Sequence, residues 1–217
     1  MLCTLAYKAI DAIALISSIP NLKQILGIKI HILNYQSEKM TICDKTINEQ
    51  QQEQQRLTAL LKLKVLDSSF ETVFDTITQI ASNVCGTPIA LISLVDDKRQ
   101  WFKSNVGMPG VTETPREISF CTHTIESDSL LEVTDALQDE RFWDNPLVTG
   151  NPNIRFYCGA PIRLPMGERI GSICVMDTKP YQLNDCQHKM MEGLAKLVSQ
   201  LLVLRETNLK TNPANCI

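Results

Sequence analysis

The stretch PIALISLVDDKRQWFKSNVG, residues 88–107, decides the fold class of this chain. Its run IALISLV is apolar on both alternating faces and rich in residues that favour strands, until Asp96 and Asp97 end it. Such a run predicts a central strand that is covered on both sides. The next run, RQWFKSNVG, alternates more clearly, so we expect it to pair with the first strand as a hairpin. Trp101 and Phe102 then face opposite sides of the sheet, one in the core and the other under a helix or at the edge of a pocket.

A second hairpin is expected between residues 156 and 176. The runs FYCGAPIRL (156–164) and RIGSICVM (169–176) flank the residues Pro-Met-Gly-Glu, which have the length and the composition of a hairpin connection. Gly159 and Gly171 lie inside the two expected strands. A glycine in such a position indicates a bulge or the close approach of a neighbouring group.

Two helices are expected before the first hairpin. The run NEQQQEQQR, residues 48–56, favours a linker helix, which leads into the domain through the apolar stripe of LTALLKLKV. Ser68 then stands three residues before Glu71, which is the spacing of a capping box. Apolar residues at helical intervals predict a helix over residues 69–85, which Gly86 ends.

A last helix is expected after the second hairpin. Asn184 or Asp185 caps it, and apolar residues in alternating steps of three and four continue to Glu206. This spacing allows the helix to form one side of a dimer interface. Helices at both ends of the domain, with at least four antiparallel strands between them, give an α+β fold.

Composition and charge exclude several classes of protein. The 217 residues include 21 basic and 24 acidic side chains with no block of like charge, so the sequence shows no electrostatic footprint for nucleic acid or an anionic membrane. The longest uncharged run near the N-terminus, residues 12–22, is too short to span a bilayer and contains Pro20. We expect a cytoplasmic domain at residues 51–208, with an unassigned extension at 1–50 and a tail at 209–217.

The cysteines and histidines form no recognisable metal or disulfide pattern. The eight Cys include no CxxC pair, and a chain of this size forms its core without disulfides, so free thiols in a reducing compartment are expected. The three His, at positions 31, 123 and 188, lie far apart in the sequence, whereas a metal site needs clustered donors. We therefore expect no metal and no cofactor.

Residues 53–206 resemble a GAF domain of the bacterial type found upstream of sensor histidine kinases and diguanylate cyclases. Five phrases carry the resemblance in the order of the family: LKVLDSSFETVFDTIT (63–78), PIALISLVDDKRQWFKSNVG (88–107), ETPREISFCTHTI (113–125), RFWDNPLVTGNPNIRFYCGAPI (141–162) and RIGSICVMDTKP (169–180). The likeness does not extend to residues 1–50.

The resemblance implies a central antiparallel sheet of about six strands, with helices on both faces and further helices at the N- and C-terminal ends. It also implies a ligand pocket between the sheet and the irregular segment 108–155, and a homodimer formed through the terminal helices. The chain leaves no room for the kinase core, cyclase or DNA-binding unit that such proteins usually carry. We therefore expect an input module, without enzymatic activity, for a separate signalling effector protein.

The candidate site lies in segment 108–155 and at the start of the strand that follows it. A few hydrogen-bonding side chains among apolar walls are typical of small-molecule pockets. The candidate ligand-binding residues are Phe120, Cys121, His123, Asp135, Arg141, Phe142, Asn145, Arg155, Phe156 and Tyr157. The same residues fit a purely structural role, because the Asn-Pro pairs form turns and the arginines can pair with nearby aspartates to hold a long loop closed.

Cys121 and His123 suggest thiol catalysis as a further possibility. If Ser119 caps a short helix, however, side chains two residues apart point in different directions and do not hydrogen-bond each other. Free methionine sulfoxide reductases are GAF proteins with a close cluster of redox cysteines, and the cysteines of this chain show no such short spacing. Phytochrome-type GAF domains attach a bilin through a Cys that His follows directly, whereas Thr122 follows Cys121. We expect no catalytic residue here.

Three functions remain open for the chain. The first is a sensory domain that binds a small molecule or partner and signals through its terminal helices. The second is a ligand-free scaffold for dimerisation or for docking to a signalling protein, which a pocket filled by Phe and Trp side chains would favour. The third is a thiol-based reductase, whose turnover would depend on Cys121. A cyclic nucleotide stays open as a ligand, but we do not favour it, because the sequence has no Gly-rich loop to hold its phosphate.

Overall fold

The computed structural model describes residues 47–211 of the chain. The predicted extension up to residue 46, and residues 212–217 of the predicted tail, lie outside the described residues. The compact unit that carries the sheet begins at Glu53. The domain limits at residues 51 and 208 stay a prediction.

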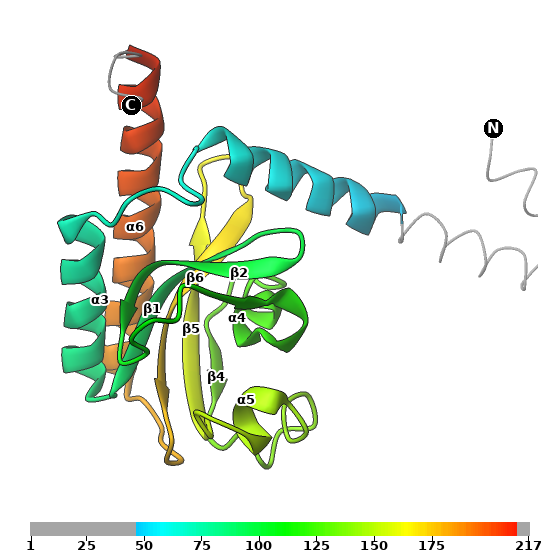
Figure 1. Ribbon diagram of the computed structural model, residues 1–217, viewed down its shortest axis with the longest axis vertical. Coiled ribbons are helices and arrows are strands. Elements are labelled where there is room, and N and C mark those ends of the chain that lie inside the picture. Colours follow the sequence, from blue (N-terminus) through cyan, green and yellow to red (C-terminus); the bar gives the residue numbers. More distant parts are fainter. Residues whose placement is uncertain (1–46, 212–217) are drawn as a thin grey trace, which may run out of the picture. The chain divides into compact units, whose positions relative to one another are not determined.

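Six strands form one antiparallel sheet, as expected from the sequence (Figure 1). The strands are β1 (Ile89–Val95), β2 (Arg99–Val106), β3 (Glu113–Pro115), β4 (Leu131–Val133), β5 (Phe156–Arg163) and β6 (Arg169–Asp177), in the order β3-β2-β1-β6-β5-β4. Both predicted hairpins, β1–β2 and β5–β6, are present, and they meet where β1 pairs with β6. Every residue of β1 is buried, so the prediction of a central strand covered on both sides is confirmed.

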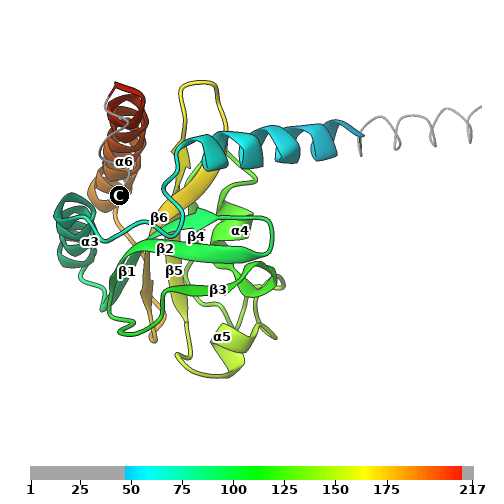
Figure 2. The ribbon, with the colours of Figure 1, turned by 45° about the horizontal axis from the view of Figure 1, so that its top comes forward.

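Long helices cover one face of the sheet and short segments cover the other (Figures 1 and 2). Helices α3 (Thr72–Cys85) and α6 (Asp185–Thr211) lie side by side on the first face, which we call the helix side. The second face carries residues 108–155, which we call the cover segment. Its short helices are η1 (Arg116–Ile118), α4 (Phe120–Thr124) and α5 (Pro146–Thr149). Residues 47–62 are helical, as predicted for the linker.

Strand alternation divides the buried side chains into two clusters. Trp101 belongs to the cluster on the helix side and Phe102 to the cluster under the cover segment, so the prediction that they face opposite sides is confirmed. In β5, Phe156 and Cys158 face the helix side, and Tyr157 between them faces the cover segment. Each central strand therefore contacts both layers of the domain.

A bulge in β2 brings a lysine into the helix side. Ser93 pairs with Phe102 and Ile92 pairs with Ser104, so Lys103 has no partner on β1. Lys103 is fully buried, and its Nζ donates hydrogen bonds to the Glu71 carboxylate and to the Ser69 carbonyl, both at 2.7 Å. The ion pair connects β2 to the chain just before α3.

The predicted capping box at Ser68 and Glu71 is wrong, and α3 begins at Thr72 rather than at residue 69. Glu71 occupies the N-cap position but makes no side-chain cap hydrogen bond. Its carboxylate instead accepts hydrogen bonds from Lys103 at 2.7 Å and from Arg205 of α6 at 3.1 Å. Two charged donors from other elements hold the carboxylate away from the helix end, because hydrogen bonds between ions are stronger than those of a cap.

The other helix ends follow the sequence. Gly86 ends α3 in the left-handed conformation at φ 68°, which suits a residue without a side chain. Asn184 accepts hydrogen bonds from the backbone N–H groups of Cys186 and Gln187, and the Gln187 side chain accepts one from the N–H of Asn184. This reciprocal pair is a capping box for α6. Of the helices in the described residues, none has the length and apolarity to cross a membrane.

Candidate functional site

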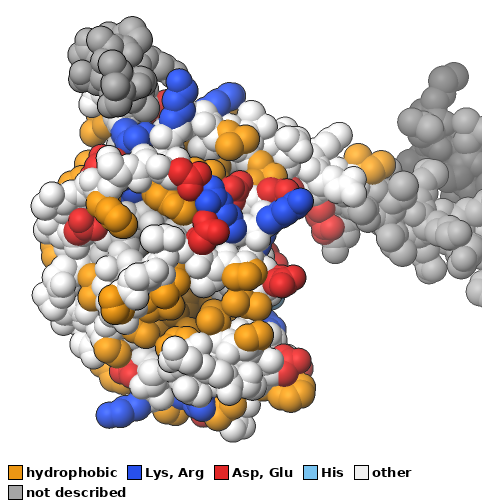
Figure 3. Space-filling model, in the orientation of Figure 1, with side chains coloured by type: hydrophobic (Ala, Val, Ile, Leu, Met, Phe, Trp, Pro, Cys, Tyr) orange, Lys and Arg blue, Asp and Glu red, His pale blue; other side chains and the backbone are white. Residues whose placement is uncertain are grey.

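A small apolar cavity lies between the sheet and the cover segment. Its volume is about 20 Å³, which is room for about one water molecule. The walls are Leu91, Gln100, Phe102, Met108, Thr114, Phe120, Cys121, Leu147, Ile154, Tyr157 and Met176. Figure 3 shows that this view of the molecule is hollowed at its centre and that hydrophobic side chains line the hollow.

Stacked aromatic rings fill most of the space beneath the cover segment. The Phe120 ring lies 4.1 Å from the Phe142 ring and 5.1 Å from the Tyr157 ring, measured between centroids. The His123 ring meets Phe142 edge-on at 5.0 Å. Phe120, Phe142 and Tyr157 are each at most 2% exposed, so the rings form a packed wall and leave only the small cavity beside them.

Two cysteine thiols lie next to this stack. The sulfur atoms of Cys121 in α4 and Cys174 in β6 are 3.7 Å apart. The Tyr157 hydroxyl donates a hydrogen bond to the Cys121 sulfur at 3.4 Å and lies 2.6 Å from the Thr124 hydroxyl. A side chain on Gly159 would collide with the Tyr157 and Thr124 hydroxyls, so the predicted close approach at this glycine is confirmed.

The two thiols differ in acidity. Burial by itself raises the pKa of Cys121, but the polar groups around its sulfur, those of Cys174, Ser172, Tyr157 and Ser93, outweigh burial and lower this pKa below its ordinary value. The pKa of Cys174 is raised, because this thiol shares a hydrogen bond with the Cys121 sulfur and because it is buried. Cys121 is therefore the more acidic thiol of the pair.

Side-chain hydrogen bonds to the backbone hold the end of the cover segment in place. Asn145 caps α5 by accepting a hydrogen bond from the Leu147 N–H at 2.9 Å, and its amide donates to the Ile118 carbonyl at 3.0 Å. Arg155 donates to the Val148 carbonyl at 2.9 Å. Both side chains thus hold the loop in place through hydrogen bonds, which is the structural role that the sequence also allowed.

The charged residues around Phe142 face away from the cavity. Arg141 is exposed, pairs with the Asp139 carboxylate at 2.6 Å and lies 5.1 Å above the Phe142 ring. Asp135 accepts a hydrogen bond from the Leu137 N–H in a local turn. The pairing of an arginine with a nearby aspartate is thus present in this loop, and neither charge is a wall of the cavity.

Three of the predicted ligand-binding residues, Phe120, Cys121 and Tyr157, line the cavity, and Phe142 and His123 stand behind Phe120. The other predicted residues lie elsewhere. Phe156 is fully buried on the helix side, where its ring meets Tyr181 edge-on at 5.3 Å. It is not a wall of this cavity, because neighbouring strand residues face opposite sides and Tyr157 takes the cover side.

The sequence interpretation missed most of the walls that the sheet provides. Leu91 and Met176 lie on the same face as Phe102, and strand alternation is the signal that could have identified them. Met108 and Leu147 come from irregular parts of the cover segment. No periodic pattern marks residues of that kind.

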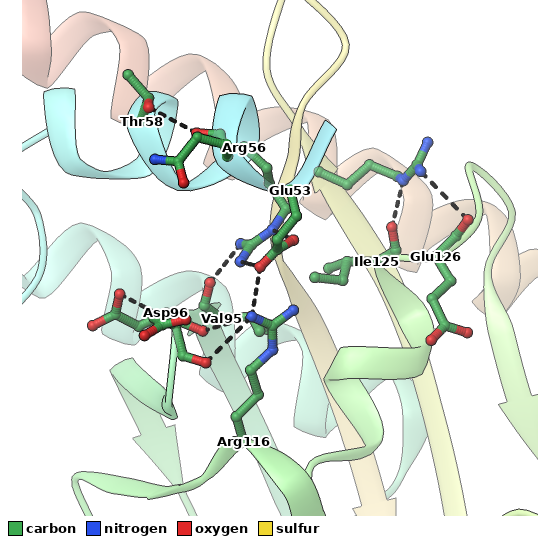
Figure 4. Close-up of polar contacts among 11 residues, drawn as sticks. Glu53, Arg56, Thr58, Val95, Asp96, Arg116, Ile125 and Glu126 are labelled. Atoms are coloured by element: carbon green, nitrogen blue, oxygen red, sulfur yellow. Dashed lines mark hydrogen bonds and ion pairs between the residues drawn. The ribbon is translucent and has the colours of Figure 1, made fainter. Parts of the chain in front are cut away.

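An ion-pair cluster joins the cover segment to the helix at residues 47–62, and we call it the Glu53 cluster. The Glu53 carboxylate pairs with Arg56 at 2.7 Å and with Arg116 at 2.5 Å, and Figure 4 shows the three side chains converging. Arg56 is buried and donates to the Val95 carbonyl at the end of β1. The hydrogen bond from Arg56 is the main cause that lowers the pKa of Glu53 to about 2.

The metal-binding and titratable side chains near the site contact separate partners. Within residues 47–211, His, Cys, Asp and Glu side chains form no group of three that could hold a metal ion. The Cys121 sulfur contacts Cys174 and Tyr157, whereas the His123 ring lies 3.6 Å from the Glu126 carboxylate. The thiol and the imidazole thus face different partners.

Comparison with known proteins places these features in a family. Residues 69–202 match the family model described as GAF domain. A cyclic di-GMP phosphodiesterase of Pseudomonas aeruginosa is 42% identical over 154 residues, which are 70% of this chain and 26% of that protein. The chain therefore spans about a quarter of the length of this curated relative.

Two solved structures illustrate the shared fold. The GAF domain of an Acinetobacter phosphoenolpyruvate-protein phosphotransferase has a TM-score of 0.54 and 14% identity, over 69% of this chain and 95% of that one. The free methionine-R-sulfoxide reductase of Neisseria meningitidis, solved in complex with its substrate, has a TM-score of 0.53 and 14% identity, over 70% of this chain and 89% of that one. At these identities the likeness concerns the fold alone.

Proposed function

Because this chain belongs to the GAF domain family, we propose that it is a sensory and regulatory module without enzymatic activity of its own. A small molecule or partner acts on the cover segment, and the terminal helices of a homodimer pass the change to a separate signalling effector. The Glu53 cluster is the observation that carries this proposal. It joins a terminal helix to the segment that roofs the cavity.

The path from the cavity to the helix at residues 47–62 is short. Phe120 and Cys121 are cavity walls in α4, and Arg116 stands in the η1 turn just before α4. Arg116 pairs with Glu53 of the terminal helix. A shift of α4 therefore changes an ion pair at the terminal helix, and a ligand that prefers one arrangement of α4 changes the population of both.

A second path leads to α6 through the sheet. Phe102 of β2 is a wall of the cavity, and the adjacent Lys103 points to the opposite side, where it pairs with Glu71. Glu71 also accepts a hydrogen bond from Arg205 of α6. Arg205 in turn donates to the Leu63 carbonyl, close to the end of the first helix. This network gives α6 and the N-terminal helix a common set of contacts.

The cavity size supports a second candidate function. A volume of about 20 Å³ admits a molecule of about the size of water, and anything larger must displace the stacked rings or the cover segment. The packing of Phe120, Phe142 and Tyr157 favours a ligand-free scaffold over a sensor of larger metabolites. In that case the domain works by dimerisation or by docking to a signalling protein.

The relative suggests the chemistry of the effector. The similar protein of Pseudomonas aeruginosa is a cyclic di-GMP phosphodiesterase, and this chain matches 26% of its length. We propose an effector that acts on cyclic di-GMP. Addition of this chain is expected to change the rate at which a cyclic di-GMP phosphodiesterase from the same cell hydrolyses its substrate. An unchanged rate would contradict the proposal that the effector acts on cyclic di-GMP.

A thermal-shift screen of nucleotides, amino acids and common metabolites separates the two functions. A ligand that binds the native state raises Tm by mass action. Leu147→Trp fills the mouth of the cavity, because Leu147 is a partly buried wall in α5. Leu137→Trp is the matched control, since Leu137 lies in the same segment, is 44% exposed and is not a wall.

A sensor is expected to give one stabilising class of compound, whose effect Leu147→Trp removes and Leu137→Trp preserves. A scaffold is expected to give no stabilising compound, with dimerisation unchanged in both variants. Stabilisation that survives Leu147→Trp would show that the ligand binds elsewhere.

A further inference from the structure

Two buried thiols from distant parts of the sequence meet under the cover segment. Cys121 lies in α4 and Cys174 in β6, and their sulfur atoms are 3.7 Å apart. Both residues are at most 2% exposed, and both are free thiols. Sulfur atoms in a disulfide are about 2 Å apart, so a small movement of the short helix α4 towards β6 would bring them to bonding distance.

Two serine hydroxyls near these thiols have no hydrogen-bond partner. Ser93 and Ser172 pair across β1 and β6 and are fully buried, and their hydroxyls lack a partner within the described residues. Ser172 stands two residues from Cys174 and Ser93 two residues from Leu91, so both face the cover side. Buried hydroxyls are nearly always paired, and an unpaired one needs an explanation.

An oxygen atom bonded to the Cys121 sulfur would supply the missing acceptor. The nearby hydroxyls of Ser93 and Ser172 favour the ionised form of this sulfur and lower its pKa, although neither forms a hydrogen bond in the structure. The Tyr157 hydroxyl adds a third donor at 3.4 Å. These groups stabilise negative charge on the sulfur or on an oxygen that it carries, which is what a reactive cysteine requires.

The cavity beside Cys121 limits the size of the reagent. Cys121 is one of its walls, and the volume of about 20 Å³ accepts a molecule little larger than water. Most other walls of this cavity are apolar, so a charged oxidant is disfavoured. Hydrogen peroxide is neutral and close to water in size.

We propose that Cys121 and Cys174 form a peroxide-reactive thiol pair that closes to a disulfide between α4 and β6. In the first step, the Cys121 sulfur attacks one oxygen of hydrogen peroxide and the O–O bond breaks. The products are a sulfenic acid on Cys121 and one water molecule, whose second proton comes from the Cys121 thiol.

In the second step, the Cys174 sulfur attacks the Cys121 sulfur and the S–O bond breaks. The departing hydroxyl takes the Cys174 proton and leaves as a second water molecule. Each sulfur has lost one electron, and the two peroxide oxygens have gained two. Cys121 is the attacking thiol and Cys174 the resolving thiol, because Cys121 lines the cavity and its sulfur accepts the hydrogen bond of the Tyr157 hydroxyl.

The disulfide would fix α4 on the sheet. Because Arg116 just before α4 pairs with Glu53, oxidation would also change the contact at the N-terminal helix. Only this last step rests on the proposed function. The chemistry of the thiol pair is independent of any other ligand, and it is measured by a different experiment.

The test is titration of the full reduced chain with hydrogen peroxide, followed by peptide mass spectrometry without reduction. Proteolysis at Asp177 separates Cys174 from Cys186. The expected product is a peptide pair linked through Cys121 and Cys174, which dithiothreitol releases. The link is expected to form before the exposed thiol of Cys186 is oxidised.

Variants assign the two roles. Cys174→Ser is expected to accumulate sulfenic acid on Cys121, which dimedone labels, whereas Cys121→Ser gives neither the label nor the link. Cys158→Ser is the matched control, since Cys158 is a buried thiol on the opposite side of the sheet, and it keeps the link. Circular dichroism checks that each variant is folded.

Tyr157→Phe tests the positioning role of the tyrosine hydroxyl. Loss of this donor is expected to slow oxidation of Cys121 by about tenfold at neutral pH and to move the pH profile of the rate upwards. A purely structural effect would slow the reaction without moving the profile. Oxidation of Cys186 before Cys121, or a wild-type chain that never yields the linked peptide, would overturn the proposal, whatever the variants do.

Discussion

On the helix side of the sheet, α3 packs the regularly spaced side chains of Phe74, Ile77 and Ala81 against the strands. On the cover side, the buried side chains of Phe120, Phe142 and Val148 come from separate short segments. On the helix side, helical periodicity brings the apolar side chains to one face of a regular element. On the cover side, separate side-chain hydrogen bonds and ion pairs hold the short segments in place. A face assembled in this way opens locally at a lower free energy than the rest of the domain.

This difference suggests a division of labour. The helix side provides stability and carries the terminal helices, and the cover side holds the cavity, the thiol pair and the unpaired hydroxyls. The Glu53 cluster connects the cover segment to the helix at residues 47–62, whereas the pair of Lys103 with Glu71 lies within the helix side and connects β2 to the start of α3.

Removal of one phenylalanine ring from each side is expected to have unequal effects. Phe156→Ala leaves a cavity under α6 that the helices cannot close, and should lower the free energy of unfolding by about 3–5 kcal/mol. Phe142→Ala should cost only about 1–3 kcal/mol, because the cover segment can move into the space. Urea unfolding of both variants measures the difference. Equal losses would show that the cover side is as rigid as the helix side.

Loss of charge at Glu71 is expected to be the next largest effect. Glu71→Gln leaves the fully buried Lys103 ammonium without its counter-ion and should cost about 2–3 kcal/mol, since the Ser69 carbonyl still accepts one hydrogen bond. Arg205→Gln is the control on the same carboxylate, and being partly exposed it should cost at most about 1 kcal/mol. If Arg205→Gln lowers the free energy of unfolding more than Glu71→Gln does, Arg205 of α6 is a more important partner of the Glu71 carboxylate than Lys103 of β2.

A methyl group at Gly159 is expected to disturb the cover side alone. Gly159→Ala forces the Tyr157 and Thr124 hydroxyls to move and should cost about 1–3 kcal/mol. Because the collision is with Tyr157, the double variant with Tyr157→Leu should be more stable than the sum of the single changes. A thermodynamic double-mutant cycle measures this coupling, and strict additivity would contradict the packing.

The smallest effect concerns the pH dependence of the Glu53 cluster. The pKa of Glu53 is lowered from 4.5 to about 2 in the folded chain, so its ion pairs stabilise the fold above pH 4.5 and are lost as the pH falls towards 2. Solvent screening limits this contribution to about 1 kcal/mol. Glu53→Gln should remove that part of the pH dependence, measured as the change in Tm between pH 6 and pH 3. If the change in Tm between pH 6 and pH 3 is the same in Glu53→Gln as in the wild type, other carboxylates cause the pH dependence of stability.

The two expected helix caps show what the sequence could and could not predict. The capping box expected at Ser68 and Glu71 is absent, whereas one is present at Asn184 and Gln187. Both pairs have the same spacing. The first fails because Lys103 and Arg205, distant in sequence, bind the carboxylate.

The candidate site was predicted less completely than the fold. Phe120, Cys121 and Tyr157 line the cavity, whereas the side chains of Asn145, Arg155 and Arg141 form hydrogen bonds or ion pairs within the cover segment, and ligand binding by any of them stays a prediction. The large spacing between cysteines in the sequence gave no hint of a pair. Strand pairing and the position of α4 nevertheless bring Cys121 and Cys174 together.

The amino-acid sequence was sufficient to predict the two hairpins, the α+β class, the end of α3 and the opposite orientation of Trp101 and Phe102. These features depend on periodicity and on local backbone preferences, which neighbouring residues specify. Only the tertiary structure decided the small volume of the cavity, the burial of Lys103 and the contact between the two thiols. Each of these depends on which strands and loops become neighbours in space, and no local pattern in the chain encodes that choice.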